Sequence, residues 1–126
     1  EIARGLDVFQ LTPTKFLSQN EIDAAKSARV NELNVQDQQK FEWPDQLAVA
    51  KAYLDQLARS KALPAKRISA LEKAIHQAEH SHMNRSKVAG LEHMAPSVEQ
   101  SATAAKNPRD SERLHALAAI LKHPAA

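Results

Sequence analysis

The chain of 126 residues contains no cysteine, which excludes disulfide bonds, thiolate catalysis, cysteine-ligated zinc and covalently attached c-type haem. Glycine occurs only twice and aromatic residues make up 4%, a composition that argues against a fold built from β-sheets. No apolar run approaches the roughly 20 residues that a membrane-spanning helix needs, so we expect no membrane span. Glycine-rich phosphate loops and nucleophile elbows are also missing from the sequence, and we expect no enzymatic activity and no cofactor.

The residues that are abundant instead are Ala, Leu, Lys, Gln and Glu, all of which favour helices. The formal net charge is +2, and basic residues alternate with acidic ones along the chain, so we expect no nucleic-acid partner. One local basic cluster, at residues 59–67, suits the end of a helix, and we interpret it as a solvated turn. The length suits a single domain with a modest core.

The strongest pattern lies between Pro44 and Ser81, where two apolar stripes recur at helical spacing. A proline, Pro44 or Pro64, opens each stripe and suits the first helical position, because its missing N–H would have no intrahelical partner there. We therefore predict two antiparallel helices that are joined by a turn at residues 60–63 and share one core seam. The seam consists of Leu47, Ala50, Leu54, Leu57, Ile68, Leu71, Ile75 and Ala78.

A further helix is indicated before this hairpin. Ser18 and Glu21 have the spacing of a capping box, in which each residue's side chain bonds the other's backbone N–H. This pattern predicts a helix from about Gln19 to Glu32, packed on the hairpin through a small apolar face. The expected face consists of Ile22, Ala25, Val30 and Leu33.

The chain after the hairpin carries two more helical patterns. A weaker stripe runs from Val88 to Val98, and Pro96 is expected to kink or break the helix there. Asn107 and Pro108 have the types expected of an N-cap and a first helical residue, and predict a final helix. Its apolar face should consist of Leu114, Leu117, Ala118 and Leu121.

These patterns together predict a mostly α fold, a four- to five-helix antiparallel bundle-like assembly with a short N-terminal strand. The helical domain should span residues 14–126 and the strand segment residues 1–13. Val8 and Phe9 make this segment apolar on both faces, as in a buried strand, and Pro13 ends it. The rest of the chain offers no strand partner, so we expect the strand to belong to a sheet formed elsewhere.

Residues 5–13, Gly-Leu-Asp-Val-Phe-Gln-Leu-Thr-Pro, resemble the Gly-Leu-x-Val/Ile-x-Asp-Val-Ser-x-Pro pattern that closes a blade in LVIVD-repeat β-propeller proteins. The chain departs from this pattern at Gln10, where Asp is usual, and at Pro13, which comes early. The resemblance implies the last propeller strand and a helical C-terminal extension, cut from a longer precursor. It also implies an extracytoplasmic location and, as partner, the parent propeller or another protein.

The only cluster with possible chemistry comprises His76, His80 and His82, followed by Met83. His76 and His80 are one helical turn apart, so both imidazoles can lie on one face and bind Zn²⁺ or Cu²⁺. The candidate metal site is therefore His76, His80 and His82, with Met83 or His93 as a further ligand. The alternative is an ordinary set of solvated histidines, because the pair falls opposite the apolar stripe and a lysine lies on the same face.

Phe41, Trp43 and Tyr53 are the large aromatic residues near the hairpin. We expect them to plug the end of the core, or alternatively to line a ligand pocket. The leading functional hypothesis is a non-enzymatic structural or protein-interaction extension of a larger protein. A metal-binding helical module is the alternative, and a helical ligand carrier is a third hypothesis that depends on the aromatic residues alone. The oligomeric state does not follow from the sequence.

Overall fold

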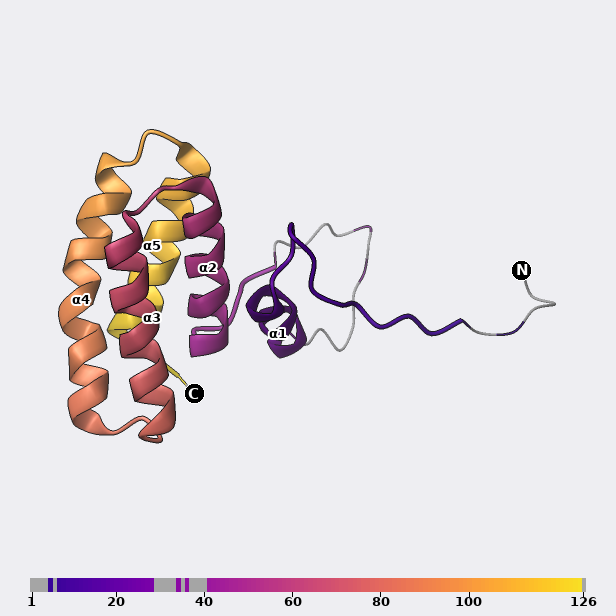
Figure 1. Ribbon diagram of the computed structural model, residues 1–126, viewed down its shortest axis with the longest axis horizontal. Helices are drawn as coiled ribbons and strands as arrows, with labels where there is room; N and C mark the ends of the chain where they lie inside the picture. The colour runs from indigo at the N-terminus through magenta and orange to yellow at the C-terminus, as the bar shows by residue number, and fades with distance from the viewer. Residues whose placement is uncertain (1–4, 6, 29–33, 35, 37–40, 126) are drawn as a thin grey trace.

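The computed structural model describes Gly5, residues 7–28, Asn34, Gln36 and residues 41–125. In this part the protein is all-α, and its helices are α1 (Gln19–Ser27), α2 (Leu47–Ser60), α3 (Ala65–His80), α4 (Arg85–Ala104) and α5 (Pro108–Lys122). Figure 1 shows α2 to α5 packed side by side and α1 outside this group, next to α2. The helices of the described part lack the combination of length and apolar character that crossing a bilayer demands.

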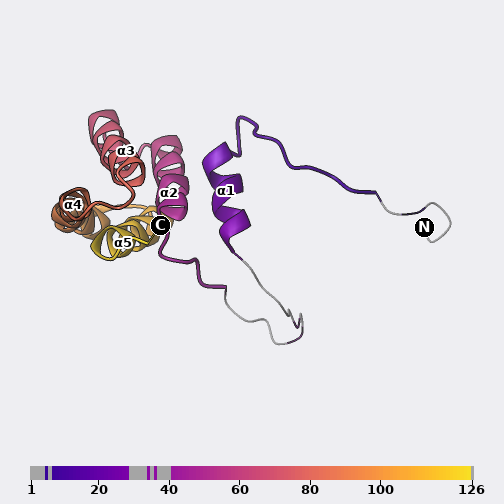
Figure 2. The same cartoon turned by 90° about the horizontal axis from the view of Figure 1, so that it is seen from below.

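Helices α2 to α5 form a closed ring of contacts, because each packs on the next in the chain and α5 returns to α2. The turns between them alternate between the two ends of the group, so neighbouring helices run antiparallel (Figure 1), and Figure 2 views them nearly end-on. We call α2 to α5 the four-helix body. One cluster of buried side chains fills its centre, and the largest members are Leu47, Leu54, Leu57, Leu71, Ile75, Leu91, Leu114, Leu117 and Leu121.

The predicted seam of the α2–α3 hairpin is confirmed, because every one of its residues is buried. Leu54 and Leu57 of α2 and Ile75 of α3 are completely inaccessible to solvent. Burying each such side chain contributes about 1.5–3 kcal/mol, which makes this spacing the main reason the two segments form helices at these positions.

Both turns that flank α3 place a non-glycine residue in the left-handed backbone region. Lys61 follows α2 with φ 58°, and His82 follows α3 with φ 49°. In each turn two successive N–H groups donate back to carbonyl groups of the last helical turn. This is the Schellman motif, in which glycine is the usual left-handed residue because it has no Cβ to clash. Met83 also has a positive φ, 58°, so the turn after α3 contains two strained positions in a row.

The start of α2 differs from the prediction. The helix begins at Leu47, and Pro44 lies upstream of it rather than at its first position. The cause is a contact with the end of the chain: the Ala125 N–H donates to the Asp45 carbonyl at 2.9 Å, and the Leu47 N–H donates to the Ala125 carbonyl at 3.1 Å. Pro64 is the N-cap of α3, one position before the predicted place.

A kink or a break was expected at Pro96; helix α4 continues through this residue, so the break is wrong. Pro96 is exposed and removes one backbone hydrogen bond. Its neighbours Ala95 and Val98 are completely buried against the rest of the core. The free energy gained by burying the inner face of α4 therefore exceeds the cost of the backbone hydrogen bond that is lost at Pro96.

The start of α5 agrees with the sequence prediction. The Asn107 side chain accepts a hydrogen bond from the Arg109 N–H at 3.0 Å, and Pro108 is the first helical residue. The predicted apolar face of α5 is also buried. Asp110, in the first turn, is the one buried charged residue in the described part, and it accepts a hydrogen bond from Arg113 at 3.0 Å.

Helix α1 is shorter than predicted. Its capping box is present, because the Ser18 side chain accepts from the Glu21 N–H and the Glu21 side chain accepts from the Ser18 N–H. The helix ends at Ser27 instead of Glu32, since Ala28 is extended; Val30 and Leu33 of the expected apolar face lie outside the described residues. The residues of α1 that are buried are Ile22 and Ala24, and Ala25 is exposed.

The predicted N-terminal strand does not form in the described part of residues 1–13. Residues 7–13 have no regular secondary structure and are exposed, and Figure 1 shows them running away from the helices. The only β-bridge in the described residues joins Gln46 to Ala125. A strand needs a neighbouring strand for its backbone groups, and this part of the chain supplies none.

Candidate functional site

His76 and His80 lie side by side on the exposed face of α3. Their rings are stacked, with centroids 4.0 Å apart and planes inclined by 21°. The Nδ1 atom of His80 lies 3.1 Å from the His76 carbonyl, to which it donates when it carries the proton. This bond leaves the Nε2 atom of His80 as the nitrogen that faces solvent. The structure thus brings the two predicted ligands together and orients one of them.

His82, the third predicted ligand, has a different position. It occupies the left-handed site of the turn after α3, and with Met83 it lines a surface hollow against the start of α2. His93 lies on α4 and is exposed. Within the residues that the structure describes, no three His, Cys, Asp or Glu side chains are arranged to hold a metal ion. The structure therefore offers two adjacent imidazoles, and the predicted third ligand is not joined to them.

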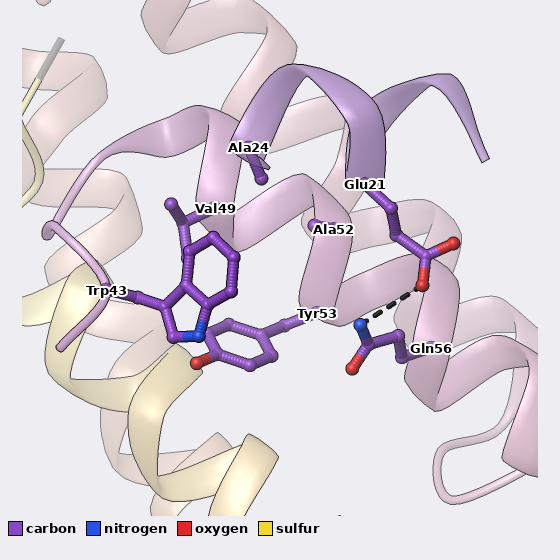
Figure 3. Close-up of a pocket in the computed structure, with 7 residues that line it drawn as sticks. All are labelled: Glu21, Ala24, Trp43, Val49, Ala52, Tyr53 and Gln56. Carbon is purple, nitrogen blue, oxygen red and sulfur yellow. Dashed lines mark hydrogen bonds between the residues drawn. The ribbon is translucent and has the colours of Figure 1, made fainter. Parts of the chain in front are cut away.

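A pocket of about 120 Å³ lies between α1 and α2. Figure 3 shows the Trp43 indole and the Tyr53 ring on one side of this pocket and the Glu21 and Gln56 side chains on the other. Trp43 comes from the segment that precedes α2, so the pocket is enclosed by residues from three separate stretches. Its remaining wall is formed by small apolar side chains, Ala24, Val49 and Ala52.

The size of this pocket bears on the ligand-carrier hypothesis. Pockets that enclose a drug-sized ligand usually measure about 300–1,000 Å³. The 120 Å³ between α1 and α2 would hold only a group of the size of one ring. Phe41 does not line the pocket but packs edge-on against Trp43, with ring centroids 5.0 Å apart. The two residues remain 41% and 46% exposed, so they do not plug the core as expected.

Glu21 is the centre of the polar contacts between α1 and α2. One of its carboxylate oxygens accepts from the Ser18 N–H at 2.7 Å and from the Arg59 guanidinium at 2.6 Å. The other oxygen accepts from the Gln56 amide at 3.1 Å (Figure 3). Arg59 also donates to the Phe16 carbonyl at 2.6 Å. We call these contacts the Glu21 clasp.

The contacts of the Glu21 clasp change the pKa of the Glu21 carboxyl. Burial of Glu21 raises its pKa, but the hydrogen bonds from Ser18, Arg59 and Gln56 lower it by more, so the pKa lies below the ordinary value of 4.5. Glu21 is therefore charged at neutral pH. Burial raises the pKa of Tyr53 above its ordinary value of 10.0, against the opposing charge of Arg113, and the phenol remains neutral.

The sequence patterns indicate Glu21 as part of a helix cap and residues 59–67 as a solvated basic turn. The contact between Glu21 and Arg59 was missed because they lie 38 positions apart and belong to different helices. The position of Glu21 could have indicated this contact, because a side chain in the first turn of a helix can reach a neighbouring helix as well as its own N-cap.

The exposed segment before α1 is the last candidate. Val8, Phe9, Leu11 and Phe16 are exposed by 84%, 90%, 62% and 70% of their surface. Four large apolar side chains exposed within one short segment favour contact with another surface over solvation. No protein-family model, curated protein or solved structure matches this chain.

Proposed function

We propose that this chain is a non-enzymatic structural or protein-interaction module, a helical body that carries an exposed apolar segment to a partner. The observation that carries the proposal is the exposure of Val8, Phe9 and Leu11, each by more than half of its surface. The four-helix body fills its core without them, so these residues have no packing role in the described part of the chain.

The chemistry of the segment favours a β-sheet as its partner. Val and Phe fit the pleated surface of a sheet, and an extended segment can add to a sheet edge through its own backbone hydrogen bonds. Phe9 and its neighbour Val8 would point to opposite faces of such a sheet, so both faces would be covered. The LVIVD-like pattern of residues 5–13 fits this role, with the parent propeller as the sheet that receives the strand.

The proposal is tested by a photo-crosslinking amino acid in place of Phe9 in the complete natural protein. A matched control carries the same group in place of Ala70, an exposed residue of α3. We expect the Phe9 position to crosslink to a β-strand, in the same polypeptide or in another protein, and the Ala70 position not to. Crosslinks from position 9 to α2–α5 would contradict the proposal, because the segment would then pack on its own helices.

The adjacent rings of His76 and His80 support metal binding as a second candidate function. Their centroids are 4.0 Å apart on an exposed face, so a small rotation of the side chains would bring two nitrogens to one ion. Two imidazole ligands bind transition metals modestly, and only in their neutral form. We expect calorimetry with Cu²⁺ to show weak binding that decreases on acidification and is lost in His80→Ala. Binding unchanged by His80→Ala would exclude this site, and His115→Ala, on another helix, is the control.

A further inference from the structure

Among the helices that the structure describes, α1 packs on α2 alone. It has nine residues and buries only Ile22 and Ala24. A helix of this length is unstable by itself in water, since stable isolated helices need roughly 12–15 residues or more. The folding of α1 therefore depends on its contact with α2, and whatever controls that contact also controls the helix.

The Glu21 clasp joins the cap of α1 to its docking contact through one carboxylate. The same oxygen that accepts from the Ser18 N–H also accepts from Arg59 on α2. A second polar contact, from the Asn20 amide to the Asp55 carboxylate at 2.9 Å, lies beside it. The Glu21 side chain is 9% exposed and that of Arg59 is 41% exposed, so the carboxylate is shielded from water while solvent reaches the guanidinium.

The charged groups around Glu21 favour its ionised form. From α2 it faces Arg59 at 2.6 Å, with Asp55 nearby in the contact with Asn20. From α5, Arg113 lines the same hollow as Glu21 and is itself paired with Asp110. On α1 the nearest charges, Asp23 and Lys26, pair with each other at 3.2 Å. Neutralising Glu21 would leave Arg59 facing an uncharged group.

We propose that Glu21 is a charge-dependent latch, which holds α1 on α2 while the carboxylate is ionised and releases it when the carboxylate is neutral. Release unfolds α1, uncovers the α2 face that contains Val49, Ala52 and Tyr53, and breaks the hydrogen bond from Arg59 to the Phe16 carbonyl. The latch rests on the contacts between α1 and α2, and does not depend on what the exposed segment binds.

The test is hydrogen exchange at neutral pH on the wild type, Glu21→Gln and the control Asp23→Asn. Glutamine keeps the shape and the capping position of Glu21 but removes its charge, and Asp23→Asn removes the same charge from a carboxylate whose hydrogen bonds are all within α1. We expect amide exchange in α1 to accelerate about tenfold in Glu21→Gln, the typical effect of losing one charge-assisted contact. Exchange in α2–α5 should stay within about twofold, and Asp23→Asn should resemble the wild type.

A second variant, Arg59→Met, tests the contact of α1 with α2 separately from the capping box of α1. It keeps the Ser18–Glu21 capping box and removes the α2 side of the clasp, so α1 exchange should again accelerate. The fluorescence of Trp43, the single tryptophan, reports on the pocket between α1 and α2 in the same samples. Its emission should shift to longer wavelength in both clasp variants as α1 leaves the indole.

The pH dependence follows from the sign of the shift. Because the folded protein holds the pKa of Glu21 below 4.5, the latch is fully closed above that value and opens as the pH falls through the lower folded pKa. The wild type should lose about tenfold of its α1 protection there, after correction for intrinsic exchange rates, while Glu21→Gln shows no such step. Three results would overturn the proposal: no protection of α1 in the wild type, equal protection in Glu21→Gln and Asp23→Asn, or joint loss of all five helices.

Discussion

The four-helix body and the region before it use apolar residues in opposite ways. From Leu47 to Leu121 the body buries its large aliphatic side chains in one cluster. The region from residue 7 to Trp43 buries Ile22 and Ala24 and contains every large apolar side chain that is exposed in the described part of the chain. The body thus covers its apolar side chains with its own helices, whereas most large apolar side chains of the preceding region are exposed in the described part of the chain.

The largest loss of stability is expected from substitutions in the core of the four-helix body. Leu54→Ala or Leu71→Ala should destabilise the protein by about 2–5 kcal/mol, because each removes a buried side chain and leaves a cavity. Ile22→Ala, on α1, should leave the main thermal transition in place and affect α1 alone. Calorimetric melts distinguish the two cases, and neutral effects of Leu54→Ala and Leu71→Ala would refute the shared core seam.

Two ion pairs have the same sequence spacing, one in the four-helix body and one on α1, and they differ in burial. Asp110 pairs with Arg113 at 3.0 Å in the body, and Asp23 pairs with Lys26 at 3.2 Å on α1, but their carboxylates are 8% and 48% exposed respectively. Asp110→Ala should cost about 1–3 kcal/mol, because it leaves a partly buried charge without its partner. Asp23→Ala should cost less than about 0.5 kcal/mol. Denaturant unfolding measures both, and equal costs would show that burial does not set the difference.

Glycine substitutions in the turns of the four-helix body should have a smaller effect, and they should raise the stability rather than lower it. Lys61→Gly and His82→Gly should each stabilise the protein by about 0.5–1 kcal/mol, because the left-handed backbone costs a side chain about 1–2 kcal/mol and glycine loses part of this gain as entropy. His82→Ala keeps the Cβ and should show no gain. If His82→Gly destabilised the protein, the histidine side chain would have a stabilising role that its position in the turn does not explain.

Deletion of residues 1–13 should have the smallest effect on the fold. The described residues of this segment make no packing contact with the buried cluster, so helical circular dichroism and the melting temperature should remain almost unchanged. The matched deletion at the other end, of residues 124–126, removes the Ala125 contacts that cover the start of α2 and should lower stability. Loss of the fold on deletion of residues 1–13 would place Val8 and Phe9 in the core.

Several parts of the fold follow from neighbours in the sequence. The seam of α2 and α3, the face of α5 and the caps at Ser18 and Asn107 were all predicted and are confirmed. These features depend on residues three or four positions apart, and helix geometry alone brings such residues together. The candidate pair His76 and His80 was also found by this spacing, and the structure places the two rings together.

The contacts between segments that are distant in the sequence depend on how the helices pack on one another. The backbone contacts of Ala125 place the start of α2 at Leu47 instead of Pro44. Burial of Ala95 and Val98 stabilises α4 across Pro96. Packing of α1 on α2 places Arg59 against Glu21. His82 became a turn residue because the short connection from α3 to α4 needs a left-handed position there. Each outcome depends on which faces of two helices meet, and local periodicity sets the apolar face of a helix without specifying the partner that covers it.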